Sequence, residues 1–302
     1  MTLRLSAIVP ATDEPPHLER VVAAIHAAAD SPDDVVVVRE APQPGPAAAR
    51  NAGAARATGD VLVFVDADVL PRADAFRRID AAFRDDPELT AVFGSYDDSP
   101  PEPDVVSGFR NLLHHHVHQE SPGEASTFWA GLGAVRRDDF FAVGGFDAER
   151  YTTASIEDIE LGMRLASSGA RMRLDPELQG THLKRWTLRT MIGTDLRARG
   201  VPWVALLAER KAAPRGLNLG WRHRVSAAAS IAFVVFALAG RPKPAGAAVG
   251  ALVVLNARFY ALLLRRRGAV HALAGVGLHA LHHLTGAAAV PLGLIEHARA
   301  RR

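Results

Sequence analysis

The first hundred residues alternate short apolar runs with segments whose apolar residues recur every three or four positions. Short runs rich in valine and isoleucine predict buried strands, and the helical spacing predicts amphipathic helices. Strands that alternate with helices are typical of a doubly wound α/β sheet with mostly parallel strands and flanking helices. The predicted strands cover residues 3–10, 33–40, 61–68 and 90–96, and the predicted helices cover residues 15–29, 46–59 and 73–87.

Two further helices are predicted in the middle of the chain, over residues 107–118 and 155–169. Ser155 is the expected N-cap of the second one, with Asp158 as its capping-box acid and Gly169 as its terminator. Four histidines of the first helix point in different directions, so a solvated or acceptor-facing surface is expected there rather than a metal site. These are His114, His115, His116 and His118.

The last third of the chain has long apolar segments bounded by basic clusters. A helix needs about 20 residues to span a bilayer, and the second and third segments are long enough. Placing the basic run 265–267 in the cytosol favours a two-helix hairpin with an interfacial third segment. Two to three membrane helices are therefore expected in 225–302, after a basic, amphipathic interface segment over 191–224. The apolar segments are residues 225–240, 245–264 and 270–295.

Charge is distributed unevenly along the chain. Residues 1–181 hold 16 Lys and Arg against 30 Asp and Glu, whereas residues 182–302 hold 19 against 3. A basic segment that flanks apolar runs, with few aromatic residues between, favours anionic lipid over nucleic acid. The absence of cysteine excludes disulfides and thiolate chemistry. The N-terminal apolar stretch is too short for a secretory signal, so the first half is expected in the cytosol.

Acidic residues lie at or just beyond the carboxyl end of the apolar run in each of the first three predicted strands. Asp13 and Glu14 follow the first, Glu40 the second, and Asp66 and Asp68 the third. Ligands of such sheets gather at the carboxyl ends of the strands, and paired carboxylates suit Mg²⁺ or Mn²⁺. A solvated strand end is one alternative. A haloacid-dehalogenase-like phosphatase is another, although that family has its nucleophile on the first strand and here two strand–helix units precede it.

Two later clusters also admit two interpretations. Glu157 and Asp158 either cap a helix or supply a base for an acceptor hydroxyl. Lys184, Arg185 and Trp186 either clamp a diphosphate or form a basic segment beside a membrane. His182 lies close enough in sequence to this cluster to be a third metal ligand.

The order of these features resembles family 2 glycosyltransferases with the GT-A fold. The resemblance rests on the acidic strand ends, the Asp-x-Asp of Asp66 and Asp68, the Gly-Gly-Phe-Asp at 144–147, the Glu-Asp pair and the Arg-Trp pair, and it covers residues 5–190. The basic, apolar tail is similar to the membrane-attached members, such as polyprenyl-phosphate sugar transferases and cellulose-synthase-like enzymes. A GT-A domain over residues 1–190, with Mg²⁺ or Mn²⁺ as cofactor, is therefore expected.

The resemblance implies a role for each matching residue, with two departures. Arg39-Glu40-Ala41-Pro42 stands where the family has Asp-Asp-Gly-Ser, which leaves the base open, and His182 replaces the glutamine of the Gln-x-x-Arg-Trp box, which favours a single transfer. The implied nucleotide-sugar-binding residues are Pro10, Asp13, Glu14, Glu40, Arg50, Asn51, Asp66, Lys184 and Trp186. The implied catalytic residues are Asp158, Glu157 and Arg185, and the metal ligands are Asp68, Asp66 and His182.

The expected protein is a metal-dependent hexosyltransferase at the cell membrane, with its catalytic domain on the cytoplasmic face. It would transfer a sugar, with inversion, from a nucleotide-diphosphate sugar to a lipid-linked or glycan acceptor of the cell envelope. A membrane-attached scaffold that binds nucleotide sugars without turnover is the alternative of a different class.

Overall fold

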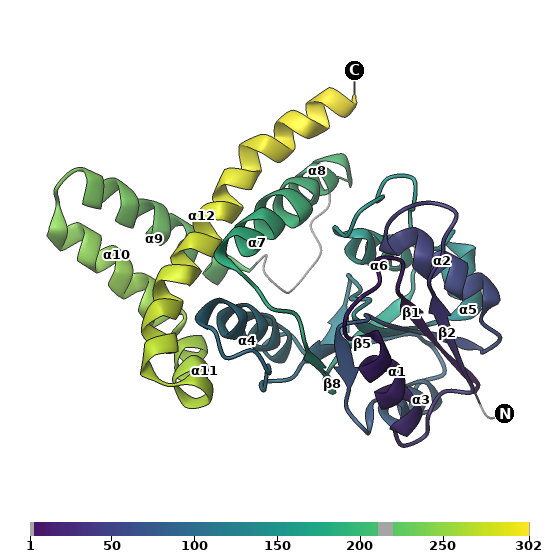
Figure 1. Ribbon diagram of the computed structural model, residues 1–302. Helices are drawn as coiled ribbons and strands as arrows, with labels where there is room; N and C mark the ends of the chain where they lie inside the picture. Colours follow the sequence, from purple (N-terminus) through teal and green to yellow (C-terminus); the bar gives the residue numbers. More distant parts are fainter. Residues whose placement is uncertain (1–2, 211–219, 302) are drawn as a thin grey trace. The chain divides into compact units, whose positions relative to one another are not determined.

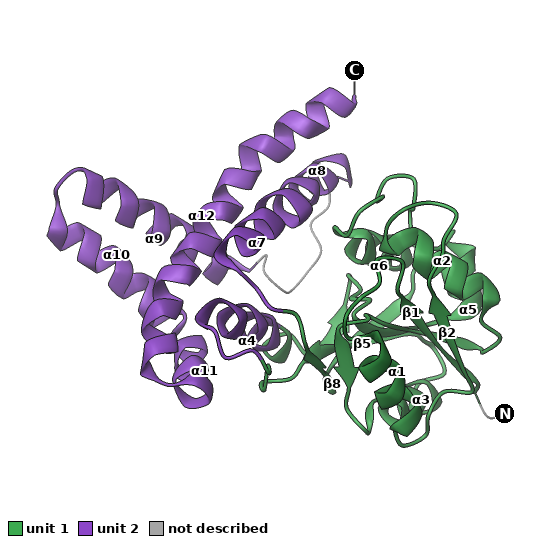
Figure 2. Cartoon of the chain, viewed as in Figure 1, with its two compact units in different colours: residues 1–101, 118–184 green, residues 102–117, 185–302 purple. Residues whose placement is uncertain are grey.

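The computed structural model of the chain describes residues 3–210 and 220–301. The chain divides into two compact units, each described by itself below (Figure 2). The first unit comprises residues 1–101 and 118–184, and the second comprises residues 102–117 and 185–302. The helical segment 102–117 thus belongs with the C-terminal part of the chain, which no local sequence pattern indicated.

The first unit is built on an eight-stranded mixed sheet (Figure 1). The order is β2-β1-β3-β7-β5-β8-β4, with β6 paired to β8. β1 is parallel to β2 and β3, whereas β7 runs antiparallel between β3 and β5. The strands are β1 (Leu5–Pro10), β2 (Asp34–Val38), β3 (Val61–Val65), β4 (Val69–Pro71), β5 (Leu89–Tyr96), β6 (Gly123–Ala125), β7 (Leu132–Arg136) and β8 (Arg171–His182).

Helices flank this sheet, so the predicted α/β class is confirmed, although the sheet is mixed instead of mostly parallel. The apolar positions of β1 and β3 are buried with those of two helices in one core, including Val21, Ile25, Phe76 and Ile79. The predicted parallel strands 3–10, 33–40 and 61–68 correspond to β1, β2 and β3. The helices of this unit are α1 (Leu18–Ala27), α2 (Pro46–Arg56), α3 (Ala75–Asp85), α5 (Arg137–Ala142) and α6 (Glu157–Ser167).

Two local expectations in this part of the chain are wrong. The residue at the N-cap of α6 is Ile156, not Ser155, and no side chain caps the helix. The Ser155 N–H instead donates to Glu157 Oε2 at 2.8 Å. The solvated surface expected for the four histidines is not observed, since His115, His116 and His118 are buried. The other expectation, an acceptor-facing surface, stays a prediction. His118 Nδ1 lies 2.8 Å from the Gly94 carbonyl oxygen, which explains why that ring points inward.

The second unit is helical, and its core joins α4 to the C-terminal helices. Phe109 and Leu112 of α4 pack in one buried cluster with Phe259 and Leu263 of α11. Trp186 belongs to the same cluster. The helices are α4 (Val105–Gln119, to residue 117 in this unit), α7 (Leu188–Gly193), the π-helix η1 (Thr194–Gly200), α8 (Val201–Arg210), α9 (Trp221–Leu238), α10 (Pro242–Leu255), α11 (Ala257–Arg267) and α12 (Ala269–Ala300).

The predicted apolar helix over 245–264 is interrupted. It forms α10 and α11, which meet at Asn256 with a bend of 75°. Asn256 is buried, and its Nδ2 donates to Ser226 Oγ of α9 at 2.9 Å and to the Leu252 carbonyl oxygen at 2.9 Å. The bend is therefore stabilised by a polar contact between residues far apart in sequence.

One described helix, α12, is long and apolar enough to cross a membrane, and α10 with α11 would count as a second span only if the bent pair acts as one. Large apolar side chains are exposed on α9, α10 and α12, among them Leu238, Val254 and Leu273. The described part of the predicted interface segment lies in α7, η1, α8 and the start of α9. Its residues 211–219 lie outside the described residues.

Candidate functional site

Acidic side chains follow three neighbouring parallel strands of the first unit. Because β1 pairs with both β2 and β3 in parallel, the carboxyl ends of the three strands lie side by side. Asp13 and Glu14 follow β1 in an exposed turn, and Pro10 is the last residue of that strand. Glu40 follows β2, and Asp66 and Asp68 follow β3. The edge at which ligands of open α/β sheets bind therefore carries six of the fourteen predicted site residues.

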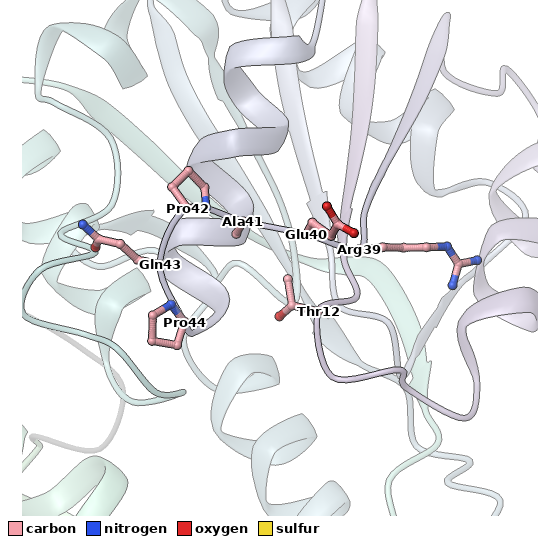
Figure 3. Close-up of a pocket in the computed structure, with 7 residues that line it drawn as sticks. All are labelled: Thr12, Arg39, Glu40, Ala41, Pro42, Gln43 and Pro44. Atoms are coloured by element: carbon pink, nitrogen blue, oxygen red, sulfur yellow. The ribbon is translucent and has the colours of Figure 1, made fainter.

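A pocket of about 450 Å³ opens after β2 (Figure 3). The Glu40 carboxylate has no hydrogen-bond or ion-pair partner among the described residues, whereas Arg39 pairs with Glu19 at 3.3 Å. A free carboxylate can accept N–H groups from the edge of a base. The pocket is lined by Thr12, Arg39, Glu40, Ala41, Pro42, Gln43 and Pro44.

Asp66 is held by a buried arginine of α2. Arg50 Nη2 donates to Asp66 Oδ1 at 2.6 Å, and Arg50 Nη1 donates to Glu157 Oε1 at 2.9 Å. Burial alone would lower the pKa of Arg50, but the two carboxylates raise it above its ordinary value. Burial raises the pKa of Asp66, and the Arg50 charge offsets only part of that rise. The end of β3 and the start of α6 are thus joined through one guanidinium group.

Asp68 lies beside a stacked histidine. His182 Nε2 is 3.5 Å from Asp68 Oδ2, and the His182 ring stacks on Tyr96 with centroids 4.2 Å apart. The pairing of β4 with β8 brings the two residues together, because Val69 is opposite His182. Burial raises the pKa of Asp68, but the hydrogen bond and charge of His182, with the charge of Lys184, lower it below its ordinary value.

Asp158 and Asp66 are held against the same backbone segment. The Ala130 N–H donates to Asp158 Oδ2 at 3.2 Å, and the Asp66 N–H donates to the Gly131 carbonyl oxygen at 3.1 Å. Helix α6 comes this close because Gly162 has no side chain: a Cβ there would collide with the backbone of Thr127 and Phe128. The two acids therefore lie at one edge of the sheet, although they are far apart in sequence.

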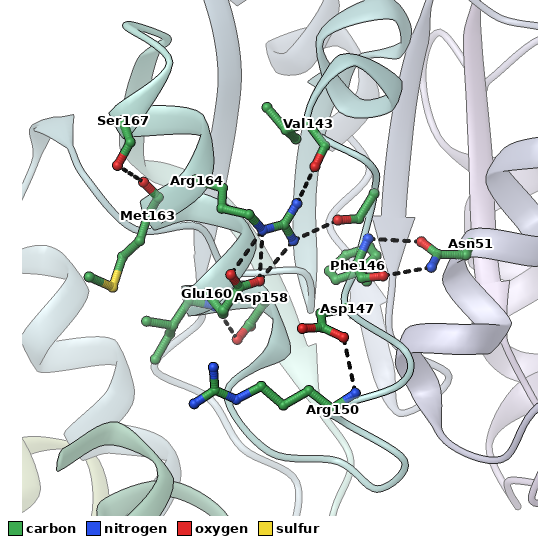
Figure 4. Close-up of polar contacts among 12 residues, drawn as sticks. Asn51, Val143, Phe146, Asp147, Arg150, Asp158, Glu160, Met163, Arg164 and Ser167 are labelled. Atoms are coloured by element: carbon green, nitrogen blue, oxygen red, sulfur yellow. Dashed lines mark hydrogen bonds and ion pairs between the residues drawn. The ribbon is translucent and has the colours of Figure 1, made fainter. Parts of the chain in front are cut away.

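The loop 144–147 is fixed by side chains whose role the sequence did not predict (Figure 4). Asn51 Nδ2 donates to the Phe146 carbonyl oxygen at 2.8 Å, and the Phe146 N–H donates to Asn51 Oδ1 at 2.9 Å. Arg164 of α6 pairs with Glu160 and donates to the carbonyl oxygens of Val143 and Gly145. The only sequence signal for these clamps is the Gly-Gly pair, whose residues have φ of +84° and +67°.

The predicted basic cluster divides at the boundary of the two units. Lys184 is the last residue of the first unit, and its charge acts on Asp68. Arg185 is exposed in the second unit, with its Nε 4.0 Å from Asp104 Oδ2. Trp186 is buried there, its backbone N–H donates to Ser107 Oγ at 2.7 Å, and Arg110 lies over its ring.

No group of three His, Asp or Glu side chains within residues 3–210 and 220–301 is arranged to hold a metal ion. The predicted ligands Asp66, Asp68 and His182 therefore do not form a complete protein site. Mg²⁺ and similar ions are commonly held by one or two carboxylates together with substrate phosphates and water. The two aspartates fit that kind of site, because Asp68 is partly exposed and one oxygen of Asp66 is not used by Arg50.

Parts of the chain are similar in sequence to known glycosyltransferases. Residues 18–142 match the family described as "Glycosyl transferase family 2". Over 171 residues the chain is 30% identical to pre-mycofactocin glycosyltransferases from two strains of Mycobacterium tuberculosis, CDC 1551 / Oshkosh and ATCC 25618 / H37Rv. The match covers 53% of this chain and 34% of each relative, so the chain spans about a third of the length of these curated relatives.

A solved structure shares the fold. It is a mannosyltransferase from Pyrobaculum calidifontis in complex with GDP-Man and Mn²⁺, with a TM-score of 0.54 and 19% sequence identity. The superposition covers 100% of this chain and 89% of that one. The mixed sheet with flanking helices is thus the GT-A fold.

Proposed function

Residues 18–142 match glycosyl transferase family 2, and we propose that the chain is a member of this family that transfers a sugar from a nucleotide-diphosphate sugar to an acceptor at the membrane. The observation that carries the proposal is the convergence of Asp66, Asp68 and Asp158 at one edge of the sheet, next to the Glu40 pocket. A donor needs a base pocket, carboxylates for its metal–diphosphate group and a base for the acceptor, and these residue types are present there.

The donor would be bound from its base to its diphosphate along the ends of β2 and β3. Glu40 would accept N–H groups of the base, with Asp13 and Glu14 in the neighbouring turn, and the free oxygen of Asp66 would face the ribose. Asp68 would be the principal ligand of Mg²⁺ or Mn²⁺, which supplies positive charge to the departing diphosphate. Lys184, whose charge acts on Asp68, would add positive charge at the same group. The mannosyltransferase with GDP-Man and Mn²⁺ supports this placement by its shared fold.

Asp158 would act on the acceptor. Asp158 is partly exposed, and its carboxylate accepts the backbone N–H groups of Ala130 and Ile159. It would take the proton of an attacking hydroxyl as the oxygen bonds to the anomeric carbon and the bond to the diphosphate breaks. One base without a second nucleophile leads to inversion. The absence of a glutamine at His182 supports a single transfer.

The acceptor would be lipid-linked or part of an envelope glycan, and the catalytic unit would lie on the cytoplasmic face. The length and apolar character of α12, with basic residues 299–302 at its end and 265–267 before it, support attachment to a membrane. The pre-mycofactocin glycosyltransferases support transfer to an acceptor but align with only 34% of their own length.

A donor screen tests the proposal. The chain of residues 1–302 is purified in detergent, and its thermal unfolding is followed with Mn²⁺ and a panel of nucleotide-diphosphate sugars. One donor should raise the unfolding temperature, and the same donor should release its nucleoside diphosphate when membrane lipid extract is added. If no donor in the panel changes the unfolding temperature and none is consumed, the proposed function is wrong.

A further inference from the structure

Arg50 is a buried charged residue beside the proposed donor site. Its guanidinium bridges Asp66 Oδ1 and Glu157 Oε1 at 2.6 and 2.9 Å, and the residue is only 5% exposed. We propose that Arg50 is a positioning residue, which holds Asp66 and Glu157 in place instead of contacting the nucleotide. The proposal deepens the proposed function and rests on it.

The remaining surface of the Arg50 guanidinium is also covered. Its Nε is buried and has no hydrogen-bond partner among the described residues. Its Cζ lies 5.4 Å from the centre of the Phe146 ring, and Asn51 fixes the loop that carries this ring. An incoming nucleotide would have to displace a carboxylate or the ring to reach Arg50. The direct nucleotide contact implied by the family resemblance is therefore replaced by a bridge between two acids.

The Arg50 bridge limits what Asp66 can bind, and it gives the neighbouring acids Glu157 and Asp158 different roles. With Oδ1 bound to Arg50, Asp66 has one oxygen left for a ligand. Glu157 is buried, with one oxygen on Arg50 and the other on the Ser155 N–H, so it is not available as a base. Asp158 remains as the accessible acid of the Glu-Asp pair. A planar guanidinium can bridge two carboxylates in this way, whereas a lysine ammonium on a flexible stem lacks the fork.

The experiment is a double-mutant cycle on donor affinity. The dissociation constant of the cognate donor with Mn²⁺ is measured by isothermal titration for the unmodified chain, Arg50→Lys, Asp66→Asn and the double variant. If Arg50 acts on the donor only through Asp66, each single substitution weakens binding by about tenfold or more, and the double variant binds no more weakly than Asp66→Asn. Arg50→Gln replaces Arg50→Lys in the cycle if the lysine variant does not fold.

Steady-state kinetics separates positioning from a loss of folded protein. Arg50→Lys should raise the KM for the donor and leave the KM for the acceptor unchanged, because the donor contact of Asp66 is the one released. A merely structural defect would lower the amount of active enzyme and leave both KM values unchanged. Arg78→Lys is the matched control, since Arg78 pairs with Asp74 on α3 at 2.8 Å, outside the proposed site.

Two results would overturn the inference, and they are distinguishable. If the effects of Arg50→Lys and Asp66→Asn on the dissociation constant multiply in the double variant, Arg50 contacts the donor directly and only the positioning role fails. If the unmodified chain binds no nucleotide-diphosphate sugar, the proposed function fails and the positioning role fails with it.

Discussion

Glu157 and Asp158 are adjacent acids with different surroundings. Glu157 is paired with Arg50, whereas Asp158 is partly exposed and is held by the Ala130 N–H. Asp158→Asn should therefore leave the affinity for the donor unchanged and lower kcat by about 10²–10⁴-fold, the range for loss of a general base. Isothermal titration with the donor and a transfer assay measure the two quantities. Near-normal kcat in this variant would show that Asp158 only supports the start of α6.

The hydrogen bonds between Asn51 and the backbone of Phe146 can be tested through their effect on stability. The Asn51 amide donates to the Phe146 carbonyl oxygen, so Asn51→Asp places a carboxylate oxygen against that carbonyl. The free energy of unfolding at pH 7 should fall by about 1–3 kcal/mol, the usual cost of an unmet polar group. Protonation restores a donor, and the repulsion raises the folded-state pKa of the new carboxyl, so the loss should shrink as the pH falls toward 5.

Urea unfolding of both proteins at pH 7 and pH 5 measures the Asn51→Asp difference. Asn51→Leu is the control, because it also removes the contact with Phe146 but cannot regain a donor. A destabilisation of Asn51→Asp that is equal at the two pH values would contradict the clamp between α2 and the loop 144–147.

At the scale of elements, the sequence predicts those strands and helices whose formation depends on residues close together in the chain. The apolar runs of β1, β2 and β3 predict strands, because buried parallel strands are apolar at successive positions. Pro46 marks the first turn of α2, because a proline there loses no helical hydrogen bond. The N-cap of α6, which the neighbouring sequence places at Ser155, is Ile156 in the structure. There Glu157, which follows the expected cap Ser155, turns toward Arg50 of α2, a residue 107 positions away.

The failures share one physical cause, which is contact between distant residues. The break at Asn256 depends on Ser226, 30 positions away. The buried histidines depend on partners such as the Gly94 carbonyl oxygen, 24 positions from His118. In the site, the position of the acids after the strands is evident from the sequence alone. The contacts made by Arg50 and Arg164 join residues far apart in sequence, so they are evident only in the folded structure.

Asp195 of η1 forms a buried ion pair with Arg110 of α4, and the contribution of this pair to stability should depend on pH. Asp195 Oδ1 is 2.8 Å from Arg110 Nη2, and Asp195 Oδ2 is 2.8 Å from His282 Nδ1. Burial raises the pKa of Asp195, but Arg110 and His282 lower it by more, to about 2. A depressed folded-state pKa stabilises the fold above the unfolded-state value near 3.8, and this contribution is lost as the pH falls through about 2.

Asp195→Asn should accordingly lower the free energy of unfolding of the second unit at pH 7, by about 2–4 kcal/mol, because the buried Arg110 guanidinium loses the Asp195 carboxylate. Near pH 2 the variant and the unmodified chain should be equally stable. Thermal unfolding in detergent, followed by circular dichroism from pH 7 to pH 2, measures the difference. Asp74→Asn on the partly exposed pair with Arg78 is the matched control, and a small effect is expected there. If the difference in stability between Asp195→Asn and the unmodified chain does not change with pH, the ionised Asp195 carboxylate does not stabilise the second unit.

At the scale of the whole molecule, charge and packing divide the chain at almost the same place. The acidic excess ends near residue 181, and the second unit resumes at Arg185. Residues 102–117 are the exception, since α4 packs with α11 in the second unit. A chain cut near residue 190 would leave Phe109 and Leu112 without these partners, so membrane attachment is better tested on the complete sequence.

The exposed apolar surface of the second unit should contact lipid. Leu238 and Leu273 are 85% and 79% exposed, and the stretch 211–295 contains no acidic residue. Because the chain has no cysteine, a single introduced thiol reports on one position. In native membranes, Leu238→Cys and Leu273→Cys should react slowly with a water-borne maleimide and rapidly after denaturation in SDS, since the thiolate that reacts forms in water.

Ser99→Cys, at an exposed position of the first unit, is the control and should react rapidly in both conditions. The same membranes washed with high salt should retain the chain, and detergent should release it, because apolar contact with lipid is not screened by ions. Release by salt together with rapid labelling at Leu238 would instead indicate a peripheral attachment through the basic clusters at 265–267 and 299–302. In that case the exposed apolar side chains of α9 and α12 would need a protein partner, because a surface of this kind is rarely left in water.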